Sequence, residues 1–188
     1  KKKTKWLGIL LSGATLLGSH LSVEAATHSS TINDPNLLQD GDTINVRTNF
    51  SAGLQVANDL PLVKSNITIN AMGTTQSLGI RGMTGSGDLT LINSQINVNS
   101  NGSAGVSWHV DNKTLTFINT TVQVKGDGTE GLYVTSPTGK VILDNSRISS
   151  ELSHGMTVFQ SNAEVKNGTV LTTSGTRAQG RTPYAIFV

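Results

Sequence analysis

The sequence has 188 residues, of which 4% are aromatic and 14% charged, no cysteine, and a formal net charge of +2. The lack of cysteine excludes a disulfide framework, a cysteine-ligated zinc site and a cysteine nucleophile. The charged fraction is well below the roughly 25% usual for globular domains. Regularly alternating Ile, Val and Leu nevertheless argue against a disordered chain.

Residues 1–25 have the parts of a secretory signal peptide. "KKKTK" is positive, and "WLGILLSGATLLG" is apolar but shorter than the roughly 20 residues that span a bilayer. Val23 and Ala25 are small enough for a signal peptidase, so we predict cleavage after Ala25 and no membrane insertion of the mature segment. Cleavage removes four lysines and Glu24, so the 14 basic and 12 acidic residues become ten and eleven, a net charge of −1. This balance argues against a nucleic-acid partner.

Residues 26–60 are predicted to form an N-terminal cap and the first strands. In "DPNLLQDG", residues 34–41, an aspartate precedes a proline and a glycine follows, which is typical of a short helix. Such a helix would cover one end of the fold. "GDTINV" at 41–46 is predicted to be the first strand, and "ITIN" at 67–70 is an early copy of a pattern that recurs further on.

That pattern is ten residues long and recurs from residue 89 onward. Its asparagines are spaced by 26, 26 and 22 residues, and a second set of glycines is spaced by 26, 26 and 24 residues. Such periods indicate stacked units, none of which buries its apolar face alone. The asparagines are Asn93, Asn119, Asn145 and Asn167, and the glycines are Gly79, Gly105, Gly131 and Gly155.

Each unit has three short segments in which apolar and polar residues alternate, without a 3.6-residue period. Three strands in 22–26 residues, with no helix between them, predict an all-β fold, a single-stranded parallel β-helix in which every strand pairs with its copy in the next coil. Residues 61–188 would form the coils. Because the chain ends inside an apparent strand, we expect it to be the N-terminal part of a longer protein.

The register predicts which side chains face the axis. The inward columns are Leu89, Leu115, Val141, Ala163; Leu91, Phe117, Leu143, Val165; Ile96, Val122, Ile148, Val170; and Val106, Leu132, Met156, Ala185. Two of the outward columns are Asn97, Gln123, Ser149, Leu171 and Ser107, Tyr133, Thr157, Ile186.

The recurring asparagine is assigned to a bend between two strands. Asparagine tolerates the left-handed backbone conformation, and its amide can hydrogen-bond to its counterpart in the next coil. We therefore expect Asn93, Asn119, Asn145 and Asn167 to form a structural ladder and not a ligand site.

"LLQDGDTINVRTNF", "SNITINAMG" and the units L-x-L-x-N-[ST]-x-[IV] with a later glycine-aliphatic strand resemble right-handed parallel β-helix proteins. They are most similar to the pectate-lyase-like adhesive domains of Gram-positive bacterial surface proteins, over residues 30–188. The resemblance implies a secreted or cell-wall-associated, extracellular adhesin that binds host or cell-wall glycans or proteins. No cofactor is predicted. Autotransporter passengers share the coil pattern and are an alternative.

A polysaccharide lyase or hydrolase of the same fold is the other alternative. It would need clustered acids on one outer face with a basic residue alongside. Asp144, Arg147 and Glu164 are the single candidate catalytic cluster, and we expect Asp144 to pair with Lys166 of the next coil. Because the outer columns are otherwise poor in acids, the chain is predicted to be non-catalytic. His109 and His154 occupy unequal positions, so no metal site is predicted.

Overall fold

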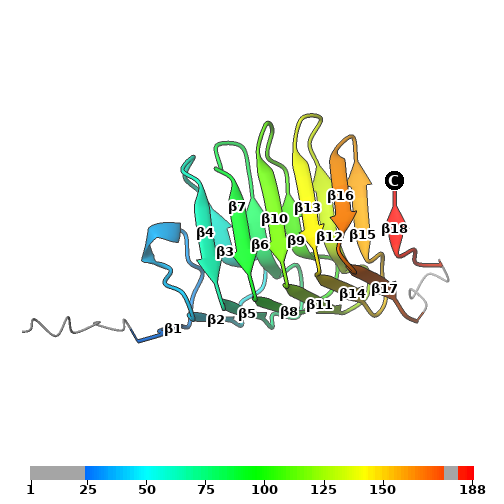
Figure 1. Ribbon diagram of the computed structural model, residues 1–188. Coiled ribbons are helices and arrows are strands. Elements are labelled where there is room, and N and C mark those ends of the chain that lie inside the picture. The colour runs from blue at the N-terminus through cyan, green and yellow to red at the C-terminus, as the bar shows by residue number, and fades with distance from the viewer. Residues whose placement is uncertain (1–23, 176–181) are drawn as a thin grey trace, which may run out of the picture.

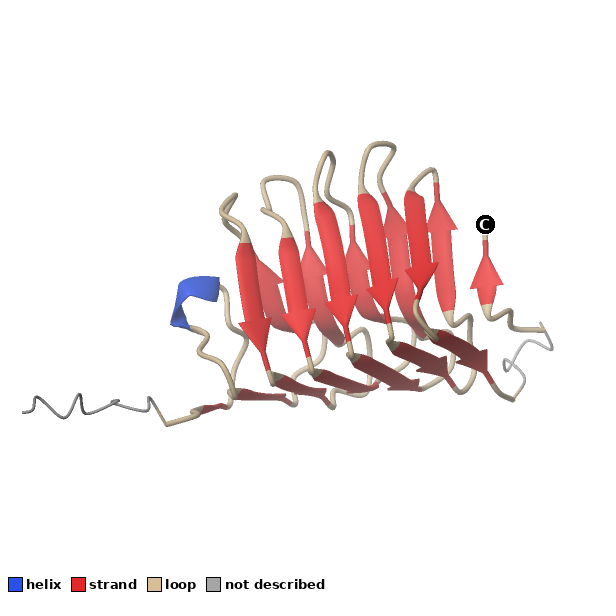
Figure 2. Cartoon of the chain, in the orientation of Figure 1, coloured by secondary structure: helices blue, strands red, loops and turns tan. Residues whose placement is uncertain are grey.

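The computed structural model describes residues 24–175 and 182–188. Residues 1–23 of the predicted signal peptide and residues 176–181 lie outside these ranges. The chain winds about one axis as a parallel β-solenoid of about five turns, with strands on three sides (Figure 1). In Figure 2 the front strands run down and the back strands run up while the coils advance to the right, so the winding is right-handed. The predicted fold class is confirmed.

The strands form three sheets in which all neighbours pair in parallel. Sheet I contains β1 (Thr27–His28), β2 (Thr43–Val46), β5 (Thr68–Ala71), β8 (Gln95–Asn99), β11 (Thr121–Lys125), β14 (Arg147–Ser150) and β17 (Val170–Thr173). Sheet II contains β4 (Leu62–Ser65), β7 (Leu89–Ile92), β10 (Thr114–Ile118), β13 (Lys140–Asp144) and β16 (Asn162–Lys166). Sheet III contains β3 (Ala52–Val56), β6 (Leu78–Gly82), β9 (Ala104–Trp108), β12 (Glu130–Thr135), β15 (Met156–Phe159) and β18 (Ile186–Phe187). A coil passes from sheet II through sheet I to sheet III.

Side chains alternate between the axis and the solvent along the strands. In β10, Leu115 and Phe117 are fully buried, whereas the residues beside them are partly exposed. Strand pairing places Leu115 between Leu89 and Val141, as predicted. The core is therefore a set of columns in which like residues stack on like residues, which fills a narrow interior without large voids.

One glycine in each coil allows the polypeptide to approach the next coil closely. A Cβ atom added at Gly105 would lie 2.6 Å from the carbonyl oxygen of Gly131 and 2.5 Å from Cγ1 of Val122. Neither glycine has a positive φ, so the requirement is for space and not for an unusual backbone conformation. This accounts for the glycine spacing of the sequence. Equivalent crowding occurs at Gly53, Gly79 and Gly155.

The recurring asparagines lie at the bend between sheets II and I. Asn93, Asn119 and Asn145 have φ values of 50°, 48° and 45°. Nδ2 of Asn119 donates to Oδ1 of Asn93 at 3.1 Å, and Nδ2 of Asn145 donates to Oδ1 of Asn119 at 2.7 Å. Asn167 keeps the left-handed backbone, with φ 52°, but its Nδ2 donates to Oδ1 of Asp144. The prediction that Asn167 extends the side-chain ladder from Asn145 is therefore wrong.

The residue after each of Asn93, Asn119 and Asn145 carries a hydroxyl that also joins coils. Oγ of Ser94 accepts from the backbone N–H of Ile67 at 3.1 Å, and Oγ of Ser146 accepts from that of Thr120 at 3.1 Å. The Ser146 hydroxyl in turn donates to the carbonyl of Asp144. These contacts satisfy buried backbone N–H groups at the bend, which explains the Asn-[Ser/Thr] pair of the repeat.

Replacing Asn119 with alanine should lower the free energy of unfolding by about 2 kcal/mol, because a residue with an ordinary Cβ must adopt the left-handed conformation and two ladder bonds are lost. Replacing Asn119 with glycine loses the same hydrogen bonds without the backbone penalty. Urea unfolding of both variants measures the two contributions separately. Equal losses for alanine and glycine would show that backbone conformation is not the reason for asparagine here.

Sheet I departs from the predicted register in the last coil. Ile148 pairs with Leu171 and not with Val170, so Leu171 faces the axis and Thr172 takes the outward position. The cause is Gly168, which follows the bend asparagine, has φ 77° and adds one residue to the bend.

Sheet III shows the same one-residue difference at its last strand. Met156 pairs with Ile186 and not with Ala185. Phe187, paired with Thr157, therefore occupies the outward position predicted for Ile186.

The last inward residues of sheet II are not buried. Ala163 and Val165 continue the predicted columns by register, yet both are exposed. No described coil lies beyond β16, so their apolar side chains face solvent at the end of the stack.

The N-terminal end is covered by a short irregular segment. The predicted helix at 34–41 is one 3₁₀ turn, η1 (Pro35–Leu37), in which Asp34 accepts a hydrogen bond from the backbone N–H of Asn36 at 3.0 Å. Leu38, which follows it, is fully buried against the first coil. The strand predicted as the first is the second, because β1 precedes it and pairs with it.

Candidate ligand-binding groove

A groove with a volume of about 560 Å³ crosses the outer face of sheet III. Its floor includes one outward residue from each of three successive strands, Arg81, Ser107 and Tyr133, which strand pairing places side by side. Parallel strands are about 4.8 Å apart, so this row is about 10 Å long. The groove therefore runs across coils, along the axis of the solenoid.

One wall of the groove is the bend that precedes sheet III. Phe50, Gln76, Gly102 and Gly128 occupy this bend in successive coils, with φ values of 57°, 49°, 62° and 68°. The first two carry side chains and the last two do not. A Cβ atom at Gly102 would meet nothing within 4 Å, so the groove is open above this part of the wall.

His109 connects the floor of the groove to the neighbouring coil. Its Nε2 lies 2.7 Å from Oγ of Ser107, and its Nδ1 hydrogen-bonds with Oγ1 of Thr135. Its ring meets that of Tyr133 edge-on, with centroids 5.5 Å apart. Partial burial and the nearby charge of Arg81 lower the pKa of His109, so the imidazole is neutral at pH 7 with both nitrogens engaged.

The groove combines groups that suit a polyhydroxylated ligand. Tyr133 and Phe50, a residue that is 70% exposed, offer apolar ring faces. Arg81 supplies hydrogen-bond donors, Glu130 supplies acceptors and Ser107 supplies both. Apolar faces with a few placed polar groups are typical of ligand sites, and the volume lies within the usual range of about 300–1,000 Å³.

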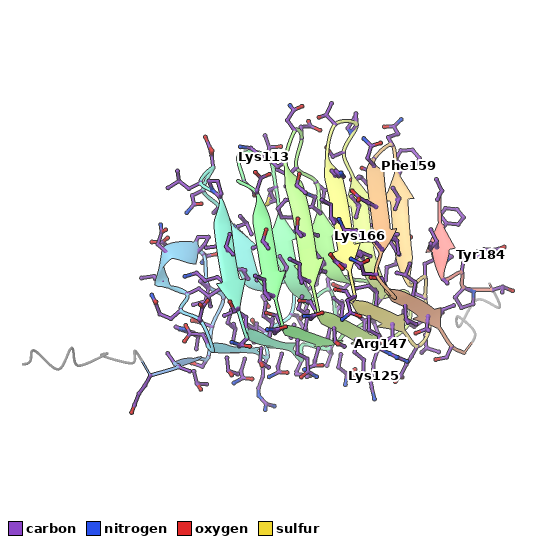
Figure 3. The ribbon with its side chains drawn as sticks, in the orientation of Figure 1. Lys113, Lys125, Arg147, Phe159, Lys166 and Tyr184 are labelled. Atoms are coloured by element: carbon purple, nitrogen blue, oxygen red, sulfur yellow. The ribbon has the colours of Figure 1, made fainter. Side chains whose placement is uncertain are left out.

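The residues of the predicted catalytic cluster lie on two different sheets. Asp144 and Glu164 are on sheet II, whereas Arg147 begins β14 of sheet I. In Figure 3, Arg147 and Lys125 are labelled on the lower sheet, whereas Lys166 is labelled on the front sheet. Within the described residues, Arg147 forms no ion pair with either acid.

Both acids of that cluster have other partners. Glu164 contacts Nζ of Lys140 at 2.8 Å and Nζ of Lys166 at 3.3 Å, and the hydrogen bond from Lys140 is the main cause of the lowered pKa of Glu164. Asp144 accepts from Asn167. The expected Asp144–Lys166 pair is wrong, because Lys166 extends along its own strand to Glu164.

The sequence placed Ser107 and Tyr133 in one outward column, but the groove was missed as a site, because its residues come from three coils and from bends whose composition is unremarkable. The glycine spacing held a usable signal. Arg81, Ser107 and Tyr133 each lie two residues after a glycine of the recurring set. Extending that register back by one coil would have placed Arg81 beside Ser107.

Within the described residues, no group of three His, Cys, Asp or Glu side chains could hold a metal ion. No helix in the described ranges is long and apolar enough to cross a membrane. Comparisons with family models, curated proteins and solved structures gave no match. Fold and groove together define a parallel β-solenoid with a surface groove that spans three coils.

Proposed function

We propose that this chain is a non-catalytic, extracellular adhesin whose groove on sheet III binds glycans. The observation that carries the proposal is the row of Arg81, Ser107 and Tyr133 on successive coils, with Phe50 at its border. A linear sugar chain lying along the axis would meet a new set of donors, acceptors or ring faces at each coil. Residues 1–25 support export, and the resemblance of the repeats supports a place at the cell wall.

The surface favours a ligand held by several modest contacts. The groove is open to solvent and crosses three coils, and a solenoid offers similar outer faces repeatedly along its axis. Repeated weak contacts gain strength when they are made by one extended ligand. The mature net charge of −1 favours neither nucleic acid nor a strongly anionic surface.

A hydrolase is the competing class, and one contact favours it. Ser107 Oγ lies 2.7 Å from His109 Nε2, the relation of a nucleophile and its base. However, the second ring nitrogen faces the hydroxyl of Thr135 and not a carboxylate. The nearby positive charge of Arg81 would also disfavour the imidazolium that proton transfer forms. The groove is therefore better suited to binding than to acyl transfer.

Replacing Tyr133 or Arg81 with alanine should weaken glycan binding about tenfold or more, because each removes a central contact of the groove. The measurement is titration of residues 26–188 against a panel of neutral and uronic-acid-containing oligosaccharides. Gly128→Asn should also weaken binding, because asparagine tolerates the positive φ and fills part of the open groove.

Arg147→Ala is the matched control, because Arg147 is also an exposed arginine but lies on sheet I. It should leave glycan affinity unchanged. Equal loss of binding for Arg147→Ala and Arg81→Ala would contradict the placement of the site. Cleavage of any oligosaccharide that disappears with His109→Asn would contradict the non-catalytic assignment.

A further inference from the structure

Asp42 is a fully buried carboxylate at the N-terminal end of the solenoid. Its Oδ2 accepts from the backbone N–H of Gln39 at 2.9 Å and lies 2.9 Å from Nε2 of His28. Its Oδ1 accepts from the backbone N–H of Ala26 at 2.7 Å. Burial raises the pKa of Asp42, but these hydrogen bonds and His28 outweigh it, so the pKa is lowered and the carboxylate is ionised.

Ala26, whose backbone N–H donates to Asp42, has a particular place in the sequence. Ala26 follows the predicted signal-peptidase site, and its carbonyl accepts from the backbone N–H of Thr43 at 2.9 Å. The next two residues form β1, which pairs with β2. The residue that would become the N-terminus is therefore already docked on the first coil, with its nitrogen directed at Asp42.

Hydrolysis of the Ala25–Ala26 bond changes the chemistry of that nitrogen. Water adds across the bond, Ala25 leaves with a carboxylate, and the nitrogen of Ala26 becomes an α-amino group. This group has an ordinary pKa of about 7.7–8.0 and is protonated at neutral pH. A neutral amide with one hydrogen thus becomes a cation with three, 2.7 Å from a buried anion.

We propose that Asp42 is an intramolecular binding site for the α-ammonium group of Ala26, formed when the chain is cleaved after Ala25, and that this ion pair fastens β1 and the η1 segment to the first coil. A buried carboxylate is costly unless it is paired and hydrogen-bonded, and among the described residues the partly exposed imidazole of His28 is the one other basic group within ion-pair distance of Asp42. The proposal rests on the predicted cleavage and not on glycan binding by the groove.

The test compares a chain that begins at Ala26 with one that begins at Glu24, both released from a removable fusion. Both keep every strand, but only the first has an ammonium group at Ala26. Each is made with Asp42 and with Asp42→Asn. With Asp42, the chain that begins at Ala26 should melt about 5 °C higher than the longer chain, and with Asp42→Asn this difference should disappear. Equal melting temperatures with Asp42, or a difference that survives Asp42→Asn, would overturn the proposal.

A second measurement needs no substitution, in case Asp42→Asn does not fold. The α-amine of the chain that begins at Ala26 is labelled with an amine-specific reagent at pH 7.5, folded and in urea, and the N-terminal peptide is quantified by mass spectrometry. Labelling in the folded state should be at least tenfold slower than in urea, because the ion pair holds the amine protonated. Similar rates would overturn the proposal, as would an exported protein that does not begin at Ala26.

Discussion

Replacing Trp108 with alanine is expected to lower the free energy of unfolding by about 3–5 kcal/mol. Trp108 is fully buried at the end of β9, and its ring covers Gly82 of the previous coil so closely that a Cβ there would overlap it. Strand pairing places Val134 on its other side. Removing the ring leaves a cavity that spans neighbouring coils, and rigid sheets on three sides cannot collapse into it.

The measurement is urea unfolding of residues 26–188, followed by circular dichroism. Trp108→Phe is the control. It leaves a smaller cavity and removes an indole N–H that makes no hydrogen bond within the described part of the chain, so it should cost only about 1 kcal/mol. Trp108 is the single tryptophan after position 25, so its fluorescence reports unfolding of the unsubstituted protein. Similar losses for the alanine and phenylalanine variants would contradict the cavity argument.

Replacing Gly105 with alanine is expected to cost about 3 kcal/mol, a large loss for one methyl group. The new Cβ would lie 2.6 Å from the carbonyl oxygen of Gly131 and 2.8 Å from Cγ1 of Val124. The oxygen belongs to the backbone of the next coil and cannot rotate away. The two coils would have to separate, which weakens strand pairing between β9 and β12.

Gly85→Asn is the matched control for Gly105→Ala. A Cβ at Gly85 would meet nothing within 4 Å, and asparagine tolerates its positive φ of 89° better than other side chains do. This variant should unfold within about 0.5 kcal/mol of the unsubstituted protein. If Gly105→Ala were equally mild, the glycine spacing would need an explanation other than close approach.

The sequence predicted the parallel coils because alternation, bend and glycine recur at nearly one spacing. The columns through Leu115 and Phe117 follow from that alone. The predicted register was wrong where the spacing changed. Gly168 lengthens one bend by a residue, and in a strand a shift of one residue reverses which side chains face the axis.

The candidate site was harder to foresee than the core. A core column repeats the same kind of residue, whereas the groove joins unlike residues such as Arg81 and Tyr133 in adjacent coils. Its hollow depends on Gly102 and Gly128, where side chains are missing. Apolar alternation carries no information about an empty space, so only the assembled sheet shows it.

The hydrogen bonds between coils join residues about 26 positions apart, as at Asn93, Asn119 and Asn145. Closing each new turn therefore requires only a short stretch of additional chain, however long the stack has become. Each finished turn also presents ready-made pairing edges to the next one. A polypeptide that emerges gradually from the ribosome or an export pore could wind up one layer at a time, with the earlier layers as its template.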